Sequence, residues 1–240
     1  MTSGSDPSAL PAGLVVRGFA PPLRLADFRL AAFDMDSTLI DIECIDEIAA
    51  AVDLKAEVAA ITEATMRGEI ADFKESLRRR VALLRGVPES ALQEIHDRRL
   101  HLNPGVEAFM AALRAAGVKT LLVSGGFTFF AERVAARLGM DYMRSNVLEV
   151  VEGRLTGRVV AQHWGDIVDG EEKRRTMLQV CAELGCAPRQ AIAVGDGSND
   201  LPMMEAAGLS IAYHAKPVVR AKAMLSIEEG GMDRALAVLR

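Results

Sequence analysis

The sequence has no apolar run near the roughly 20 residues that a membrane-spanning helix needs. The first 22 or so residues are rich in Ser, Gly, Pro and Ala, and they lack the charged start and apolar stretch of a signal peptide. Basic residues form no stripe, and the net charge of -5 argues against a nucleic-acid partner. These absences predict a cytoplasmic globular protein that binds neither membranes nor nucleic acid.

Cysteine is also scarce. Cys44, Cys181 and Cys186 are an odd number of cysteines, and their spacing is not typical of a metal site. We expect them to be reduced and to pack as small apolar side chains, which agrees with a cytoplasmic location. The chain therefore offers no soft ligand set for a metal ion.

The apolar pattern divides the chain into two kinds of segment. Residues 42–102 follow a helical pattern, whereas strands and helices alternate from residue 119 onward. Alternation predicts a parallel sheet covered by helices on both faces, and the helical stretch is too long for a simple crossover. We therefore predict an α/β fold with three parts: a flexible tail at 1–24, a sheet core at 25–40 and 104–240, and a small all-helical cap at 41–103.

Three polar motifs directly follow predicted strands. The strands 30–33, 119–123 and 191–194 precede, in that order, Asp34-Met35-Asp36-Ser37-Thr38, Ser124-Gly125-Gly126 and Gly195-Asp196-Gly197-Ser198-Asn199-Asp200. In open parallel sheets, ligands bind at the carboxyl ends of the strands. We therefore expect the three motifs to share one site.

The carboxylates in these motifs suit phosphoryl transfer. Asp34 can attack phosphorus, and Asp36 can protonate the leaving alcohol and then activate water. Asp196, together with Asp34 and a backbone carbonyl near Asp36, offers the hard oxygen ligands that Mg²⁺ prefers. The sequence thus predicts a nucleophile, an acid and a magnesium site in one place.

The charge on a transferred phosphoryl group also needs cations and N–H donors. Lys173, at the start of a predicted helix, can neutralise that charge, while Ser124 and the Gly125 amide can donate hydrogen bonds. Each motif alone has an ordinary alternative, because Lys173 lies in a charge run that could be solvated and the glycine motifs could be plain turns. Their joint occurrence, in this order and after these strands, favours a shared site.

The order of these motifs resembles the haloacid dehalogenase-like phosphatases, and more narrowly the bacterial phosphoserine phosphatases. The resemblance runs from about Phe28 to the C-terminus and implies a Rossmann-like core with a helical cap inserted after the first motif. It also implies Mg²⁺-dependent hydrolysis of L-phosphoserine to serine and phosphate through an aspartyl phosphate, the last step of serine biosynthesis. The narrower resemblance is carried by Asp34-Met35-Asp36-Ser37-Thr38, Glu43-Cys44-Ile45-Asp46-Glu47-Ile48-Ala49, Ser124-Gly125-Gly126-Phe127 and Ala212-Tyr213-His214-Ala215-Lys216-Pro217.

The resemblance implies roles for individual residues. Asp34 would be the nucleophile and Asp36 the proton donor, and both would bind the metal together with Asp196. In the cap, Glu43 would receive the substrate ammonium group and Arg80 the substrate carboxylate. The phosphoryl group and its surroundings would be held by Ser124, Gly125, Lys173 and Asn199.

Three further positions follow from the resemblance, and one from helix-end chemistry. Met66 and Phe73 match cap positions that shield the substrate from water, and Asp200 would support the metal site. Asn103, directly before Pro104-Gly105, is the predicted N-cap residue of the next helix.

The charges of the substrate support Glu43 and Arg80. A small zwitterion needs one anion and one cation at the end away from its phosphate, and an arginine can pair with a carboxylate in a bidentate way. The competing interpretation makes Arg80 a solvated member of the run Arg78-Arg79-Arg80. Two wider alternatives stay open: a phosphatase or phosphotransferase for another small phosphomonoester, and a catalytically silent relative that acts as a binding module.

Overall fold

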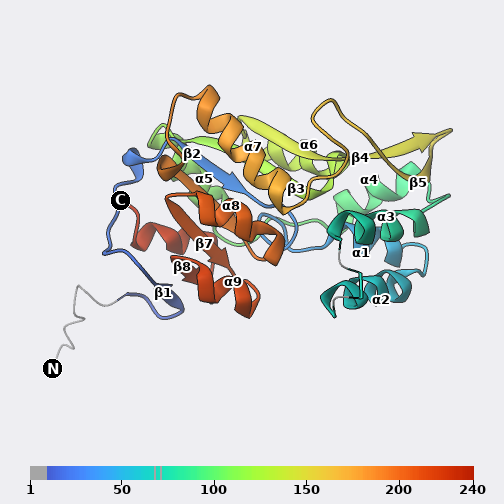
Figure 1. Cartoon of the computed structure of the whole chain (residues 1–240), viewed down its shortest axis with the longest axis horizontal. Coiled ribbons are helices and arrows are strands. Elements are labelled where there is room, and N and C mark those ends of the chain that lie inside the picture. Colours follow the sequence, from blue (N-terminus) through green and yellow to red (C-terminus); the bar gives the residue numbers. More distant parts are fainter. Residues whose placement is uncertain (1–9, 68, 71) are drawn as a thin grey trace.

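The structure is a computed structural model that describes residues 10–67, 69–70 and 72–240. Its strands are Leu14–Val16 (β1), Leu30–Phe33 (β2), Lys119–Phe127 (β3), Tyr142–Val151 (β4), Arg154–Val160 (β5), Ala191–Gly195 (β6), Leu209–Tyr213 (β7) and Leu225–Ile227 (β8). They form one sheet in the order β1-β8-β7-β6-β2-β3-β4-β5 (Figure 1). Neighbours are parallel except at the two edges, where β1 and β5 run antiparallel to β8 and β4. The predicted α/β fold is confirmed.

The central strand β2 is buried on both faces of the sheet. Leu30 and Ala32 belong to one hydrophobic cluster, whereas Ala31 and Phe33 belong to another. This division follows from the strand geometry, because successive side chains point to opposite faces. β2 pairs in parallel with β3 on one side and β6 on the other. The carboxyl ends of three strands therefore meet where Asp34 begins its loop.

Helices cover both faces of this sheet. On the face of Phe33 lie α5 (Val106–Ala115) and α6 (Thr128–Leu138), and the ring of Phe33 meets that of Phe109 edge to face with 6.1 Å between centroids. The opposite face is covered by α7 (Gly170–Glu183), α8 (Leu201–Ala206) and α9 (Pro217–Lys222). None of the described helices is both long and apolar enough to cross a membrane. Short 3-10 helices lie at Leu25–Asp27, Pro188–Gln190, Ser198–Asp200 and Met232–Ala237.

The segment between β2 and α5 carries helices α1 to α4, which lie beside one end of the sheet (right side of Figure 1). All four fall within residues 41–103, for which we keep the name cap; the boundaries between cap and core stay a prediction. The hairpin of β4 and β5 also reaches the cap, since the N–H of Gly86 donates to the carbonyl of Leu155 at 2.8 Å. The four helices are Cys44–Ala50 (α1), Lys55–Met66 (α2), Phe73–Leu83 (α3) and Glu89–Arg98 (α4).

Part of the predicted flexible tail is folded. Leu14–Val16 form β1, whose register places Leu14 opposite Ile227 of β8, and the side chain of Leu14 is buried. The prediction of a flexible tail is therefore wrong for this strand, while residues 1–9 lie outside the described residues. Local sequence did not reveal β1 because its partner strand comes from the other end of the chain.

Two local predictions are also corrected. Ser124-Gly125-Gly126 belongs to β3, which continues to Phe127 with a register shift after Val123, instead of forming a loop. The N-cap residue of α5 is Gly105 rather than Asn103. The side-chain amide of Asn103 donates instead to the carbonyls of Thr38 and Ile40, each at 2.9 Å, and so ties the cap connection to the core.

Candidate active site

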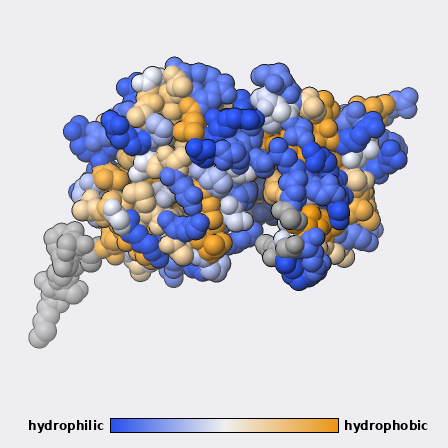
Figure 2. Space-filling model, viewed as in Figure 1, coloured by the Kyte–Doolittle hydropathy of each residue, from blue (hydrophilic) through white to orange (hydrophobic). Residues whose placement is uncertain are grey.

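A pocket of about 460 Å³ lies between the core and the cap. In Figure 2 it opens as a hollow between the larger lobe on the left and the smaller lobe on the right. Lys173 does not line it, because this side chain is buried behind Asp34. The predicted residues that line the pocket are Asp34, Asp36, Glu43, Arg80, Ser124, Gly125, Asp196 and Asn199.

The end of β2 fixes the first pair of carboxylates. The N–H of Asp34 donates to the carbonyl of Val194 in β6 at 3.0 Å, which extends the sheet pairing to the nucleophile position. The carbonyl of Met35 then accepts from the N–H groups of Leu39 and Ile40, at 2.8 and 3.1 Å. This tight turn directs the chain into the cap and leaves Asp36 at the pocket wall.

Lys173 is fully buried and bridges two carboxylates. Its Nζ lies 2.8 Å from Oδ1 of Asp34 and 2.7 Å from Oδ1 of Asp200. Asp169 is the N-cap residue of α7, and its side chain accepts from the N–H of Glu172 at 2.8 Å, so the helix begins just before the lysine. Burial alone would lower the pKa of Lys173, but the charges of Asp200 and Asp34 outweigh burial and raise it. The lysine is therefore a fixed positive charge rather than a member of a solvated run.

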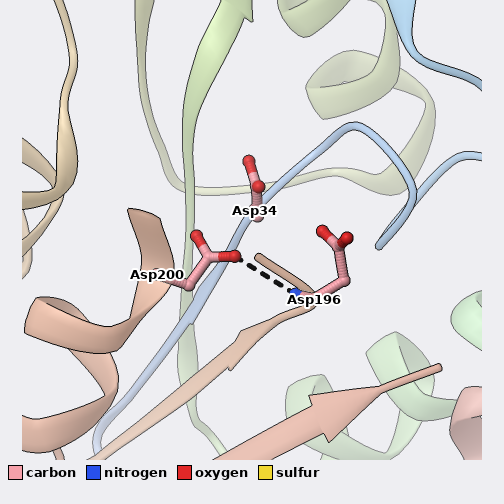
Figure 3. A group of neighbouring side chains, drawn as sticks. All are labelled: Asp34, Asp196 and Asp200. Atoms are coloured by element: carbon pink, nitrogen blue, oxygen red, sulfur yellow. Dashed lines mark hydrogen bonds between the residues drawn. The ribbon is translucent and has the colours of Figure 1, made fainter. Parts of the chain in front are cut away.

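Asp34, Asp196 and Asp200 form a group of carboxylates whose ligand oxygens lie within 4.8 Å of one another (Figure 3). Oδ2 of Asp200 accepts from the N–H groups of Asp196 and Gly197, at 3.1 and 3.0 Å, while its Oδ1 contacts Lys173. Both oxygens of Asp200 are thus engaged by the protein. Asp34 and Asp196 are left to present oxygens to a cation.

The predicted metal set differs from this group by one member. The carboxylate of Asp36 does not belong to the group, and Asp200 takes the third place. The predicted part of Asp36 at a metal, through its backbone carbonyl, stays a prediction. Asp36 stands two residues beyond Asp34, in the turn after β2, and its side chain lines the pocket beside Gly126.

The carboxylates of the pocket raise one another's pKa values. Burial, with the charge of Glu43 added, raises the pKa of Asp36 to about 7. Burial and the charges of Asp200 and Glu43 raise the pKa of Asp196 to about 7 as well. Burial and Asp200 also raise the pKa of Asp34, and the contact with Lys173 opposes that rise. The carboxylates here outnumber the two lysines that act on them, Lys173 and Lys216, so a further cation would be stabilised, and oxygen donors of this kind suit a hard divalent ion.

The glycines of β3 bring the backbone to the pocket wall. A Cβ atom at Gly126 would lie 2.8 Å from Oδ2 of Asp36, and one at Gly125 would lie 3.3 Å from the ring of Phe73. Oγ of Ser124 accepts from the N–H of Gly126 at 2.9 Å. The carbonyl of Gly125 accepts from Nδ2 of Asn146 at 2.8 Å. Sequence reasoning missed Asn146, because its role depends on the pairing of β4 with β3 and on no motif of its own.

The three consecutive arginines of α3 do three different things, since neighbouring helix positions point about 100° apart. Arg78 pairs with Asp166 in the core, and Arg79 pairs with Glu75 of its own helix at 2.7 Å. Arg80 lines the pocket, where its charge lies close to those of Asp46 and Glu43. The interpretation of Arg80 as a solvated charge is therefore wrong.

Two buried polar side-chain atoms lack a hydrogen-bond partner in the described part of the chain: Oδ1 of Asp36 and Nε of Arg80. Both residues line the same pocket, one from the core and one from the cap. A buried polar atom without a partner is costly, so such atoms usually mark a place where something else binds. Two residues that line the pocket thus each keep one buried polar atom without a partner among the described residues.

Further cap residues complete the lining. Glu43 stands just before α1 and accepts a hydrogen bond from Oγ of Ser37 at 2.7 Å. Phe73 lines the pocket as predicted, while the side chain of Met66 lies outside what the structure describes. Sequence reasoning missed the hydroxyl-bearing residues of the wall, because spacing alone does not tell which face of α2 or α3 meets the pocket. These residues are Thr62, Thr65 and Ser76.

Comparison with known proteins agrees with this geometry. A family model described as haloacid dehalogenase-like hydrolase matches residues 28–208. The chain is 64% identical over 234 residues to phosphoserine phosphatase of Albidiferax ferrireducens, covering 98% of this chain and 99% of that protein. It is 62% identical over 235 residues to phosphoserine phosphatase of a Polaromonas species, covering 98% of this chain and 100% of that protein.

Solved structures are similar as well. A phospho-aspartyl intermediate analogue of phosphoserine phosphatase matches with a TM-score of 0.81 and 35% identity, over 89% of this chain and 99% of that one. A substrate-bound phosphoserine phosphatase complex matches with a TM-score of 0.81 and 34% identity, over 89% and 99% of the two chains. The predicted core with a helical insertion is therefore shared with these proteins.

Proposed function

The chain belongs to the haloacid dehalogenase-like hydrolases, and from this premise we propose that it is a phosphoserine phosphatase, which hydrolyses L-phosphoserine to serine and phosphate. Two relatives with 62–64% identity over nearly the whole of both chains carry that activity in their names. The observation that carries the proposal is the pair of unpartnered buried atoms, Oδ1 of Asp36 and Nε of Arg80, in one pocket.

Asp34 is the proposed nucleophile. Its Oδ1 is held by Nζ of Lys173 at 2.8 Å and by the N–H of Met35 at 2.7 Å, so the carboxylate cannot rotate freely and Oδ2 is left for attack. Attack forms an Asp34–phosphorus bond and breaks the bond from phosphorus to the serine oxygen. Water then cleaves the aspartyl phosphate and regenerates the carboxylate.

Asp36 is the proposed acid and base. We propose that its Oδ1, which has no partner among the described residues, gives a proton to the departing serine oxygen. The same oxygen then removes a proton from the water that attacks the aspartyl phosphate, so Asp36 ends each cycle protonated as it began. Ser124 and the Gly125 amide are proposed to donate to the phosphoryl oxygens, and Asn199 to support them from the loop after β6.

A divalent ion, proposed to be Mg²⁺, fits the donor set of the core. Asp34, Asp196 and the backbone carbonyl of Asp36 would hold it, since they offer only hard oxygen ligands and both oxygens of Asp200 are engaged by the protein. When bound, such an ion neutralises negative charge on the phosphoryl oxygens. Thr38 already donates to Oδ1 of Asp196 at 3.4 Å, which orients that carboxylate.

The cap is proposed to recognise the amino-acid part of the substrate. Arg80 would pair with the substrate carboxylate, which supplies the partner that its Nε lacks, and Glu43 would receive the ammonium group. A bare phosphate ester offers neither group, so it would leave Nε of Arg80 unpaired. The assignment to serine biosynthesis and the cytoplasmic location stay predictions from the sequence.

The test is phosphate release from a panel of esters, with L-phosphoserine, L-phosphothreonine, glycerol phosphate and p-nitrophenyl phosphate, before and after chelation. We expect phosphoserine to have the highest kcat/KM of the four esters. Chelation should abolish phosphate release, and added Mg²⁺ should restore it. A higher kcat/KM for another ester would contradict the assignment of phosphoserine as the preferred substrate. Transfer of phosphate to an added alcohol in preference to water would favour the phosphotransferase alternative.

A further inference from the structure

Helix α3 carries two stripes of side chains. Phe73, Leu77 and Arg80 repeat at helical spacing and line the pocket. Lys74 and Arg78 are offset from them by one or two positions, so they lie on a neighbouring face of the helix. Lys74 and Arg78 have no part in the proposed chemistry, and they do not line the pocket.

This basic stripe meets acidic side chains of the core across the edge of the pocket. Nζ of Lys74 lies 3.4 Å from Oδ1 of Asp166 and 3.6 Å from Oδ2 of Asp169. Arg78 pairs with the other oxygen of Asp166. The four side chains form a network rather than one isolated pair, which is the arrangement in which partly exposed charges have a measurable effect.

The acidic partners belong to the rigid wall of the core. Asp169 is the N-cap residue of α7, four positions before the buried Lys173. Val168 directly precedes Asp169. Its N–H donates at 2.8 Å to Oδ1 of Asn146, whose Nδ2 donates to the carbonyl of Gly125. A displacement of this segment would therefore disturb the pocket itself, so the network can use it as a fixed support.

The other end of α3 is attached separately. After the helix ends, Gly86 donates to the carbonyl of Leu155 and the N–H of Leu155 donates to the carbonyl of Val87, both at 2.8 Å. These bonds join the cap to the hairpin of β4 and β5. The helix is thus held at its start by ion pairs and at its end by backbone hydrogen bonds, with Arg80 between the two.

We propose that Lys74, Arg78, Asp166 and Asp169 are positioning residues, which set the place of α3 and thereby hold Arg80 and Phe73 over the aspartates of the core. They touch no substrate and act through the helix. The proposal rests on the proposed function only where it names phosphoserine, because a shift of α3 would move Arg80 and so weaken the binding of the substrate carboxylate. Backbone attachment at the far end limits the shift, so the effect is a few-fold.

The experiment compares Asp166→Asn, Arg78→Gln, the reversed pair Arg78→Asp/Asp166→Arg, and the control Glu205→Gln. Asn keeps the oxygen that accepts from the N–H of Ile167, so Asp166→Asn removes the charge with little change to the loop. Glu205 forms an exposed pair with Lys222 at 3.1 Å and does not line the pocket, which makes it a matched control. Two readouts are used: kinetics with phosphoserine and p-nitrophenyl phosphate, and backbone hydrogen exchange of residues 73–83.

We expect Asp166→Asn and Arg78→Gln each to raise KM for phosphoserine about three- to tenfold, with kcat within about twofold and little change for p-nitrophenyl phosphate. Hydrogen exchange of α3 should become faster in both, and the reversed pair should restore both readouts. Asp166→Asn behaving like Glu205→Gln would overturn the proposal, as would equal KM changes for the two substrates. Should the unmodified chain fail to hydrolyse phosphoserine, the proposed function falls, while hydrogen exchange still decides whether the network holds α3.

Discussion

The two walls of the pocket differ in how their charges are balanced before any ligand arrives. On the core wall, the buried Lys173 already contacts Asp34 and Asp200, and Asp200 accepts two backbone hydrogen bonds as well. On the cap wall, Arg80 has a buried Nε without a partner among the residues that the structure describes. The ion pairs around Lys173 on the core wall are therefore already formed within the protein, whereas the arginine of the cap wall keeps a nitrogen that a ligand could pair.

This difference separates two tasks. A charge network that is already satisfied needs no rearrangement when the reaction begins, which suits groups that must meet the transition state. The desolvation cost of a buried arginine without a partner is offset when an anion binds to it. Such an arginine favours substrates that carry the anion and so selects among them. Asp36 is the exception on the core wall, and it is the group that must gain and lose a proton. We therefore expect core variants to affect rate and stability, and cap variants to affect substrate choice.

The largest effect should come from Asp34→Asn, which keeps the side-chain shape and removes the attacking oxygen. We expect a loss of kcat on the order of 10⁴-fold or more for phosphoserine and p-nitrophenyl phosphate alike. Circular dichroism should show an unchanged fold. Mass spectrometry of the unmodified chain during turnover should find a hydroxylamine-sensitive phosphate on the peptide that holds Asp34. Phosphate on Ser37, Thr38 or Ser124 would contradict this mechanism.

The next effect should be on stability, through Asp200→Asn. Removing one partner of a buried ion pair costs about 3–5 kcal/mol, and for a chain of 240 residues this lowers Tm by about 10 °C. Glu205→Gln, which alters an exposed pair, serves as the control and should change Tm by less than about 2 °C. Equal melting temperatures for the two variants would mean that the ion pairs of Lys173 do not stabilise the fold.

A smaller effect is expected for the stability of Arg80→Ala. Because Nε of Arg80 has no partner in the described part of the chain, the removal of this side chain should leave Tm within about 2 °C of the unmodified chain. Arg79→Ala, at the preceding position and paired with Glu75 of the same helix, is the matched control. A large loss of Tm in Arg80→Ala alone would show that this arginine supports the cap and is not reserved for a ligand.

The smallest effect should appear on acidification. Burial would raise the pKa of Asp166, but the hydrogen bond from Arg78 and the charge of Lys74 outweigh burial and lower it. A carboxyl group with a lowered folded pKa adds stability above its ordinary pKa and loses it as pH falls through the folded value. The hydrogen exchange of α3, measured relative to the intrinsic exchange rate of its amides at the same pH, should therefore rise below about pH 4. Asp166→Asn should lack this rise; an identical rise in the variant would exclude Asp166 as its source.

The core of the site could be predicted from the sequence because Asp34 directly follows β2 and Asp196 directly follows β6. Asp34 and Asp196 stand at the ends of parallel strands that pair with each other, so their meeting follows from local patterns and one rule of sheet topology. Other features depend on long-range packing. Whether Arg78, Arg79 or Arg80 meets the pocket depends on the rotation of α3, and β1 depends on a partner near the C-terminus. No local pattern encodes either one.

The separation of tasks is tested most directly by one ratio: kcat/KM for phosphoserine over kcat/KM for p-nitrophenyl phosphate, in the unmodified chain, Arg80→Ala and Arg79→Ala. Loss of a buried pair costs about 3–5 kcal/mol, so Arg80→Ala should lower the ratio more than about a hundredfold. Arg79→Ala should leave the ratio within about threefold of the unmodified chain. A parallel fall for both substrates in Arg80→Ala, with the ratio unchanged, would contradict the assignment of substrate choice to the cap.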